Sequence, residues 1–235
     1  MKEKFKEGFL SGSQLKLVAL VAMTVDHIGY YLFPDADFLR IIGRLAFPIF
    51  AYMIAEGCRY TRNRKKYLLT IALLGLGCQL VTFVAARSLF QCILITFSLS
   101  IGLIFLFDNA KSRKTISSFL WLGVGIGTVL FLTDIAPRLL SETDYAVDYG
   151  FCGVFLPVAI FVAGRKRDKL IFMTAVLCLI ALDYGNPQWF SLGAVPFLAF
   201  YNGKRGNAVP KNLFYIYYPL HIGVIILIDV LMKAV

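Results

Sequence analysis

Long apolar stretches alternate with short polar connections along almost the whole chain. An α-helix needs about 20 apolar residues to cross the hydrocarbon core of a bilayer, and runs near that length recur here. The pattern predicts an all-α, polytopic transmembrane protein of about nine helices, with a range of eight to ten. The apolar segments cover roughly residues 15–33, 40–58, 67–86, 89–107, 116–133, 150–164, 169–183, 189–201 and 212–232.

The sixth to eighth segments are short for a membrane crossing. A 14-residue helix spans only about 21 Å, whereas the hydrocarbon core is about 30 Å thick. Two arrangements between Lys169 and Lys204 stay open, because two crossings and one re-entrant hairpin leave both flanks on the same side. Complete crossing by these segments is therefore not predicted.

Composition excludes a soluble protein. The chain is 59% hydrophobic and only 16% charged, whereas soluble domains carry roughly a quarter charged residues. No linker or low-complexity tract divides the apolar segments. Residues 1–235 are accordingly predicted to form a single integral membrane domain.

The formal net charge of +10 is distributed unevenly along the chain. Basic residues gather at the amino terminus and after the second, fourth, sixth and eighth segments, and the intervening connections hold acidic residues or, after the third segment, Arg87 alone. The positive-inside rule then predicts a cytoplasmic amino terminus on a retained signal-anchor helix and, for nine crossings, an external carboxyl terminus. These features favour an inner membrane, and the lipid bilayer rather than nucleic acid explains the charge. The basic clusters are Lys2, Lys4, Lys6 and Lys16; Arg59, Arg62, Arg64, Lys65 and Lys66; Lys111, Arg113 and Lys114; Arg165, Lys166, Arg167 and Lys169; and Lys204, Arg205 and Lys211.

Few ionisable residues lie inside the apolar segments, and such residues usually face a protein interior or a watery cavity because charges are costly in hydrocarbon. Among them are Asp26, His27, Arg44, Glu56 and His221, which include both histidines of the chain. At about 1.5 Å per residue, His27 and His221 lie roughly 18 Å and 14 Å from the inner ends of their segments. We expect His27, Arg44 and His221 to meet in one polar pocket.

Adjacent residues on a helix point about 100° apart, so Asp26 is not expected to orient His27. Asp26 is predicted to pair with Arg44 or His221 instead, and an Asp26–Arg44 pair could be purely structural. Glu56 is expected near the inner surface, beside Arg59, where a salt bridge to the basic loop is the simpler interpretation. The basic loop itself is either a topological signal alone or also an anion-binding site.

Several motifs of the chain together resemble the TraX family, small bacterial membrane proteins related to the wider transmembrane acyltransferases. The resemblance runs from Lys16 to His221. One departure is Gln79-Leu80-Val81, where the family tends to carry an acidic residue followed by Ile-Pro-Phe. The motifs are Ala22-Met23-Thr24-Val25-Asp26-His27-Ile28-Gly29, Ile42-Gly43-Arg44-Leu45-Ala46-Phe47-Pro48-Ile49-Phe50-Ala51, Glu56-Gly57-Cys58-Arg59-Tyr60-Thr61-Arg62-Asn63 with Lys66-Tyr67, Asp148-Tyr149-Gly150, and Phe214-Tyr215 with Tyr218-Pro219-Leu220-His221.

The resemblance implies a membrane acyltransferase that moves an acetyl or other acyl group from cytoplasmic acyl-CoA, with acetyl-CoA as donor. The family is named for acetylation of the amino terminus of a conjugative pilin. The acceptor here would be an amine or hydroxyl of a peptide amino terminus, a sugar or a small molecule, and no metal is expected.

By this analogy His27 is the general base, with Asp26 or His221 positioning it or the acceptor. Arg44 or Tyr218 would stabilise the oxyanion. The basic loop would hold the phosphates of coenzyme A. The candidate cofactor-binding residues are Glu56, Arg59, Arg62, Asn63, Arg64, Lys66 and Tyr67.

Other classes of function stay open. A proton-coupled transporter or exporter could relay protons through Asp26, His27 and Glu56, although no inverted repeat of broken helices is recognisable. A metal site from His27, His221 and Asp26 has too few ligands at a diagnostic spacing. A signalling or scaffold protein is the remaining alternative, and the short connections offer little surface for partners.

Overall fold

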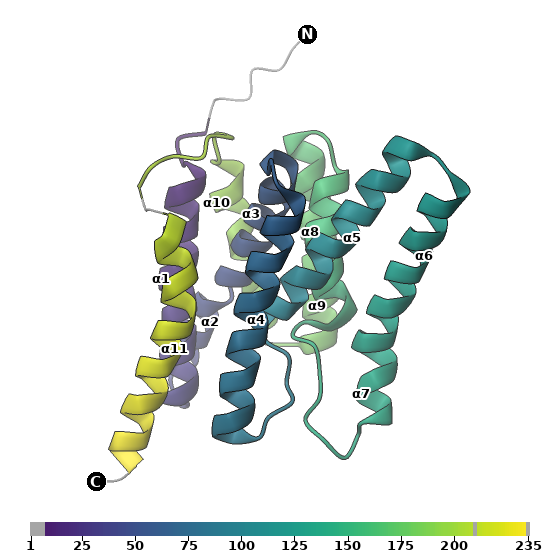
Figure 1. Ribbon diagram of the computed structural model, residues 1–235. Coiled ribbons are helices and arrows are strands. Elements are labelled where there is room, and N and C mark those ends of the chain that lie inside the picture. The colour runs from purple at the N-terminus through teal and green to yellow at the C-terminus, as the bar shows by residue number, and fades with distance from the viewer. Residues whose placement is uncertain (1–7, 209–210, 234–235) are drawn as a thin grey trace. The chain divides into compact units, whose positions relative to one another are not determined.

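The computed structural model describes residues 8–208 and 211–233 (Figure 1). Lys2, Lys4 and Lys6 of the first basic cluster lie outside these ranges, as do the side chains of Lys211, Phe214 and Tyr215. Within the described ranges the regular structure is helical and no β-strand is present, so the all-α prediction is confirmed.

The helices of these ranges fall into nine segments, one at each predicted position. The second segment is α2 followed by α3, the fifth joins α6, a π-helical turn η1 and α7, and the eighth joins a 3₁₀ helix η2 and α10. The bounds are α1 (Gly12–Tyr31), α2 (Asp37–Gly43), α3 (Ala46–Tyr60), α4 (Arg64–Ala86), α5 (Ile93–Arg113), α6 (Ile116–Leu130), η1 (Phe131–Ile135), α7 (Ala136–Leu139), α8 (Gly150–Val162), α9 (Lys166–Tyr184), η2 (Gln188–Gly193), α10 (Ala194–Ala199) and α11 (Lys211–Lys233).

The break between α2 and α3 was not predicted. It falls at Arg44 and Leu45, directly before the helix that contains Pro48. Proline has no amide hydrogen for the carbonyl four residues earlier, which is that of Arg44, and its ring collides with that carbonyl in a continuous helix. Pro48 thus accounts for the interruption at Arg44.

Five helices among the described residues are long and apolar enough to cross a membrane: Asp37–Tyr60, Arg64–Ala86, Ile93–Arg113, Ile116–Leu139 and Ile216–Lys233. The chain is accordingly a multi-pass membrane protein. Helix α8 is apolar but shorter, as its sequence suggested, and α1, α9 and η2–α10 are not in the group of five. Nine crossings, and the orientation of the two termini, stay predictions.

The chain divides into two compact units, Met1–Met53 with Met173–Val235, and Ile54–Phe172. Helices α3 and α9 each run from one unit into the other. The single membrane domain stays a prediction, and each unit is described by itself.

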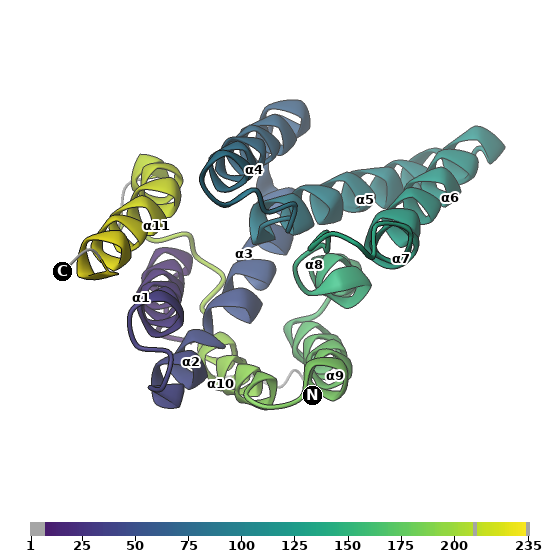
Figure 2. The ribbon, with the colours of Figure 1, turned by 90° about the horizontal axis from the view of Figure 1, so that it is seen from below.

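In the first unit, α1 lies between α2 and α11 (Figure 2). The start of α1 is closed by a capping box, in which Ser11 and Gln14 satisfy each other's backbone amides. The next two amides, of Gly12 and Ser13, donate to the carbonyls of Lys204 and Arg205 at 2.8 Å each. The amino end of α1 is thereby tied to the connection that follows α10.

In the second unit, α5 is bordered by α4, α6 and α8 (Figure 2). Its Phe97, Ile101 and Ile104 side chains are buried. The buried Ser100 hydroxyl donates to the carbonyl of Val154 in α8 at 2.8 Å, so a polar contact adds to the apolar packing between α5 and α8.

Two connections of the second unit are joined at Asp144. Its carboxylate accepts hydrogen bonds from the Ser88 hydroxyl at 2.5 Å and from the Leu89 amide at 2.8 Å. Beside it, Gln91 exchanges backbone hydrogen bonds with Ala146 and Asp148. The Ser88 hydroxyl and then the Leu89 amide hold the pKa of the Asp144 carboxyl below its ordinary value.

We predict that this junction opens in acid. A carboxyl with a lowered pKa contributes stability above its unfolded value of about 3.9, and loses it as the pH falls through the folded value. The chemical shift of the Leu89 amide proton should therefore titrate with a midpoint below about 3.9. In Asp144→Asn the acid transition should be absent, and its persistence there would assign it to another group.

Candidate functional site

The two histidines of the chain meet between α1 and α11. His27 Nδ1 lies 2.8 Å from His221 Nε2, and His221 Nδ1 lies 2.9 Å from the carbonyl oxygen of Tyr217. His221 is buried and His27 partly buried. Two residues 194 positions apart in sequence are thus joined by one hydrogen bond.

The hydrogen-bond partners assign the protons of the neutral pair. A carbonyl oxygen can only accept, so His221 Nδ1 must donate to Tyr217 and His221 Nε2 carries a lone pair. That lone pair accepts from His27, so His27 Nδ1 bears the other proton. The Nε2 of His27 is left with a lone pair, which is what a general base requires.

Aromatic rings surround His221. The Tyr217 ring stacks on it with centroids 5.2 Å apart and planes inclined by 7°, and the Tyr218 ring meets it edge-on at 5.6 Å. Tyr217 also bonds through its hydroxyl to Thr24 of α1, with 2.7 Å between the two oxygens. Tyr218, a predicted catalytic residue, is therefore in contact with the histidine pair.

Asp26 lies at the centre of a second group. Its Oδ1 accepts from Arg44 Nη2 at 2.7 Å and its Oδ2 from Arg40 Nη1 at 2.8 Å. The Arg40 guanidinium also lies over the Tyr30 ring, 5.1 Å from the centroid. The structure thus places Asp26 against Arg44, one of the two partners predicted for it, and adds Arg40.

Arg44 is further held by two protein oxygens. Its Nε donates to the carbonyl of Arg40 and its Nη1 to Gln188 Oε1, each at 3.3 Å. Gln188 is only 2% exposed. These contacts join α1, α2 and η2, so Arg44 supports the packing of three elements.

Asp26 and His27 face different neighbours of α1. Asp26 points to α2 and His27 to α11, and these two helices lie on different sides of α1 in Figure 2. The 100° step between successive helical residues explains the divergence. The structure thus has a histidine pair and a neighbouring ion-pair network, and one pocket shared by His27, Arg44 and His221 stays a prediction.

Four contributing residues were missed in the sequence: Thr24, Arg40, Gln188 and Tyr217. Arg40 had a signal, because it lies four residues before Arg44 and hence on the same helical face. Thr24 stands in one of the TraX motifs, but its role, like those of Gln188 and Tyr217, depends on which helices pack together.

The predicted anion-binding residues belong to the second unit, and several of them contact protein groups. Lys169 donates to Glu56 in a buried ion pair, with 2.5 Å between Nζ and Oε1. Arg59 donates to the carbonyls of Phe161 and Ala163 at 2.7 Å and 3.3 Å. Those carbonyls are at the carboxyl end of α8, where helices leave acceptors unpaired, so Arg59 caps that end.

Other residues of the basic loop have local partners. Asn63 caps α4, its side chain accepting from the Lys66 amide at 2.9 Å. Arg64 pairs with Asp108, and the Tyr67 hydroxyl packs against Gly57. Arg59, Arg62, Arg64 and Lys66 are all exposed. The guanidinium groups of Arg59 and Arg64 contact protein groups, so Arg62 and Lys66 are the better candidates of the predicted set for binding an anion.

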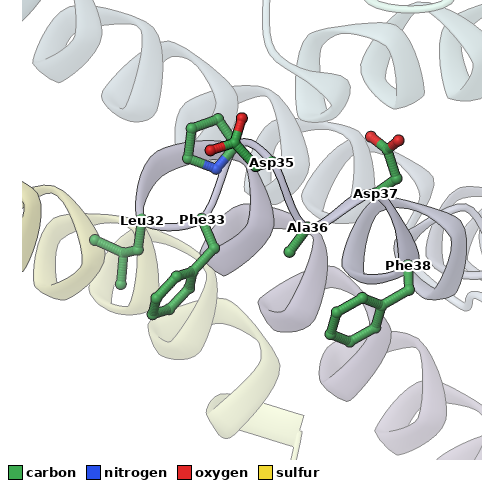
Figure 3. A pocket seen from close by; sticks show the side chains of 7 residues that line it. Leu32, Phe33, Asp35, Ala36, Asp37 and Phe38 are labelled. Atoms are coloured by element: carbon green, nitrogen blue, oxygen red, sulfur yellow. The ribbon is translucent and has the colours of Figure 1, made fainter.

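A cavity of about 550 Å³ lies at the turn between α1 and α2. Leu32, Phe33, Asp35, Asp37 and Phe38 are among its lining residues (Figure 3). The two carboxylates lie on one side and the two rings on the other. The cavity starts just beyond the end of the helix that carries His27, in the same unit.

The described residues contain no group of three or more His, Cys, Asp or Glu side chains that could hold a metal ion. Asp26, which the metal-site alternative required, has its two carboxylate oxygens on Arg40 and Arg44. The contacts of His27 and His221 are those of a hydrogen-bonded pair.

Comparison with known proteins gives one family and two relatives. Residues 11–229 match the family model described as TraX protein. The probable fimbrial assembly protein FimC, serogroup H1, of Dichelobacter nodosus is 26% identical over an alignment of 244 positions, which covers 92% of this chain and 94% of that protein. An uncharacterized protein of Rickettsia prowazekii (strain Madrid E) is 29% identical over 169 positions, covering 72% of this chain and 60% of the relative. No solved structure matches the chain.

Gly43 allows the close approach of α2 to Asp26. A Cβ at this position would lie 2.1 Å from Asp26 Oδ1 and 2.3 Å from Asp26 Cβ. We therefore predict that Gly43→Ala separates α1 from α2 and costs about 1–3 kcal/mol, as overpacking does. Thermal unfolding in detergent measures the loss; Gly102→Ala is the matched control, because nothing lies within 4 Å of its added carbon. Equal midpoints for the two variants would contradict the prediction.

Proposed function

The chain belongs to the TraX family, and on that premise we propose that it is an acetyltransferase of the bacterial inner membrane. Acetyl-CoA on the cytoplasmic side is the donor, and an amine or hydroxyl is the acceptor. The observation that carries the proposal is the hydrogen-bonded histidine pair, which in its neutral form leaves a lone pair on His27 Nε2.

His27 acts as the general base. Its Nε2 takes the proton of the acceptor N–H or O–H as the acceptor attacks the thioester carbonyl carbon. The resulting tetrahedral intermediate collapses, the carbon–sulfur bond breaks, and the coenzyme A thiolate receives the proton from His27. The products are the acetylated acceptor and coenzyme A, with every proton accounted for.

His221 supports the charge that develops on His27. As Nε2 gains a proton, the Nδ1–H of His27 becomes a stronger donor to His221 Nε2, 2.8 Å away, and charge-assisted hydrogen bonds are the stronger ones. The Tyr217 carbonyl keeps the proton of His221 on Nδ1, so that His221 Nε2 can accept the hydrogen bond from His27. His221 is therefore the orienting partner of the base.

Tyr218 and Arg44 are the two oxyanion donors considered. The Tyr218 ring contacts His221, and the Arg44 guanidinium donates to Asp26, to the Arg40 carbonyl and to Gln188. The Asp26 network then has a supporting role, which is to fix the α1–α2 pair that carries His27.

Arg62 and Lys66 are proposed to bind the phosphates of acetyl-CoA. Their charges are exposed at the basic loop, and arginine forks match phosphate oxygens. Arg59 and Glu56 are less suited, because their charged groups contact α8 carbonyls and Lys169, respectively.

A peptide amino terminus is the acceptor class that we favour. The Dichelobacter relative is named for fimbrial assembly, and fimbriae are assembled from protein subunits. The cavity beyond α1 combines carboxylates with phenylalanine rings, which suits a peptide amino terminus followed by apolar residues. The terminus binds there as the ammonium, and it reacts as the free amine after losing one proton to water.

The test is coenzyme A release from acetyl-CoA by protein purified in detergent, with a peptide amine as acceptor. We predict that His27→Gln lowers the rate by roughly 10²–10⁴-fold, the range for loss of a general base. The control is Ser112→Ala, since that hydroxyl contacts only the Asp108 carbonyl of its own helix. Unaltered release by His27→Gln would refute the role of His27; flux driven by a pH gradient, with no acetyl-CoA binding, would favour the transporter.

Arg62→Glu should raise the KM for acetyl-CoA on the order of tenfold and leave kcat unchanged, because a charged hydrogen bond to phosphate is replaced by repulsion. Arg59→Gln is the contrasting variant: it removes the cap of α8 and should lower the unfolding midpoint rather than acetyl-CoA affinity. An unchanged KM in Arg62→Glu would make the basic loop a topological signal only.

A further inference from the structure

Tyr217 and Thr24 form a second link between α11 and α1. The two hydroxyl oxygens are 2.7 Å apart, and Thr24 Oγ1 also lies 2.9 Å from the carbonyl oxygen of Leu20. Because that carbonyl can only accept, the Thr24 proton points to Leu20. Tyr217 must therefore donate to Thr24, so the direction of this short chain of hydrogen bonds is fixed.

The second link is one helical turn from the histidine pair on both helices. Thr24 precedes His27 by three residues, and Tyr217 precedes His221 by four. The two helices run in the same direction (Figure 1). One hydrogen bond would let α11 pivot or slide on α1, whereas two bonds about 5 Å apart along the axis restrict both movements.

Tyr217 contacts His221 in two further ways. Its carbonyl accepts the Nδ1 proton, and its ring stacks on the imidazole. A single residue thus determines which nitrogen of His221 carries the proton and how its ring plane is oriented. Through Thr24, it also determines the position of His221 along the helix axis relative to His27. A residue that served only to pack α11 would not need all three contacts.

We infer that Tyr217, anchored by Thr24, is a positioning residue that keeps His221 protonated on Nδ1 and facing His27, so that the Nε2 lone pair of His27 stays available. Its effect on turnover rests on the proposed function. Its effect on the histidine pair does not, and can be measured in the absence of any substrate.

The chain has only two histidines, so [¹⁵N]histidine-labelled protein, purified without a polyhistidine tag, reports on this pair alone. In the wild type the ¹⁵N spectrum should show both imidazoles as Nδ1–H forms, with scalar coupling from His27 Nδ1 to His221 Nε2. Tyr217→Phe keeps the ring and the carbonyl, and Thr24→Val keeps the shape of the side chain. Both should lose the coupling or show mixed tautomers.

Thr24→Ser is the conservative variant, because it keeps the hydroxyl; it should restore the wild-type spectrum. In the release assay, Tyr217→Phe and Thr24→Val should lower kcat by about 10-fold to 100-fold, with the KM for acetyl-CoA unchanged. This is the size seen when a residue that orients a metal-bound histidine by a hydrogen bond is removed. The double variant should be no slower than the slower single variant, because both changes remove one hydrogen bond.

Wild-type spectra and kcat in both Tyr217→Phe and Thr24→Val would overturn the inference and leave the link a packing contact, even if the unfolding midpoint falls. Altered spectra in protein that transfers no acetyl group would uphold the positioning of His221 and refute the proposed function. The two claims therefore fail separately.

Discussion

The hydrogen bond between His27 and His221 depends on how α11 packs on α1, and the proposed chemistry depends on that hydrogen bond. Contacts elsewhere on α1 restrict this helix. The capping box and the carbonyls of Lys204 and Arg205 hold its amino end, and the Asp26 ion pairs hold the side that faces α2. Charged and polar groups placed in an apolar segment are costly unless paired. The pairing of each such group on α1 thus fixes the helix and selects its neighbours.

Two groups of polar residues lie on different sides of α1. Asp26 takes up the positive charges of two arginines on the α2 side, while the histidine pair on the α11 side is surrounded by tyrosine rings. In the proposed function the ion pairs serve the scaffold, and the histidine pair serves the reaction.

The number and type of helices were predictable, because apolar length is a property of each segment alone. The Asp26–Arg44 pair was also predictable, since so few charges lie inside apolar segments. The partners of Arg59 were not, because backbone carbonyls at the end of α8 carry no sequence signature. The same holds for Tyr217: its carbonyl is invisible in the sequence, and its hydroxyl finds Thr24 only once α1 and α11 pack together.

The central claim is that His27 Nε2 is the base of an acyl transfer, and chemical rescue tests it most directly. In His27→Gly the lost imidazole leaves space beside His221 for 4-methylimidazole supplied in solution. The account predicts that acetyl transfer, nearly absent in the variant, returns with saturable dependence on the added base and is not restored by a non-basic azole of similar size. Transfer by His27→Gly at the wild-type rate without any added base would contradict it.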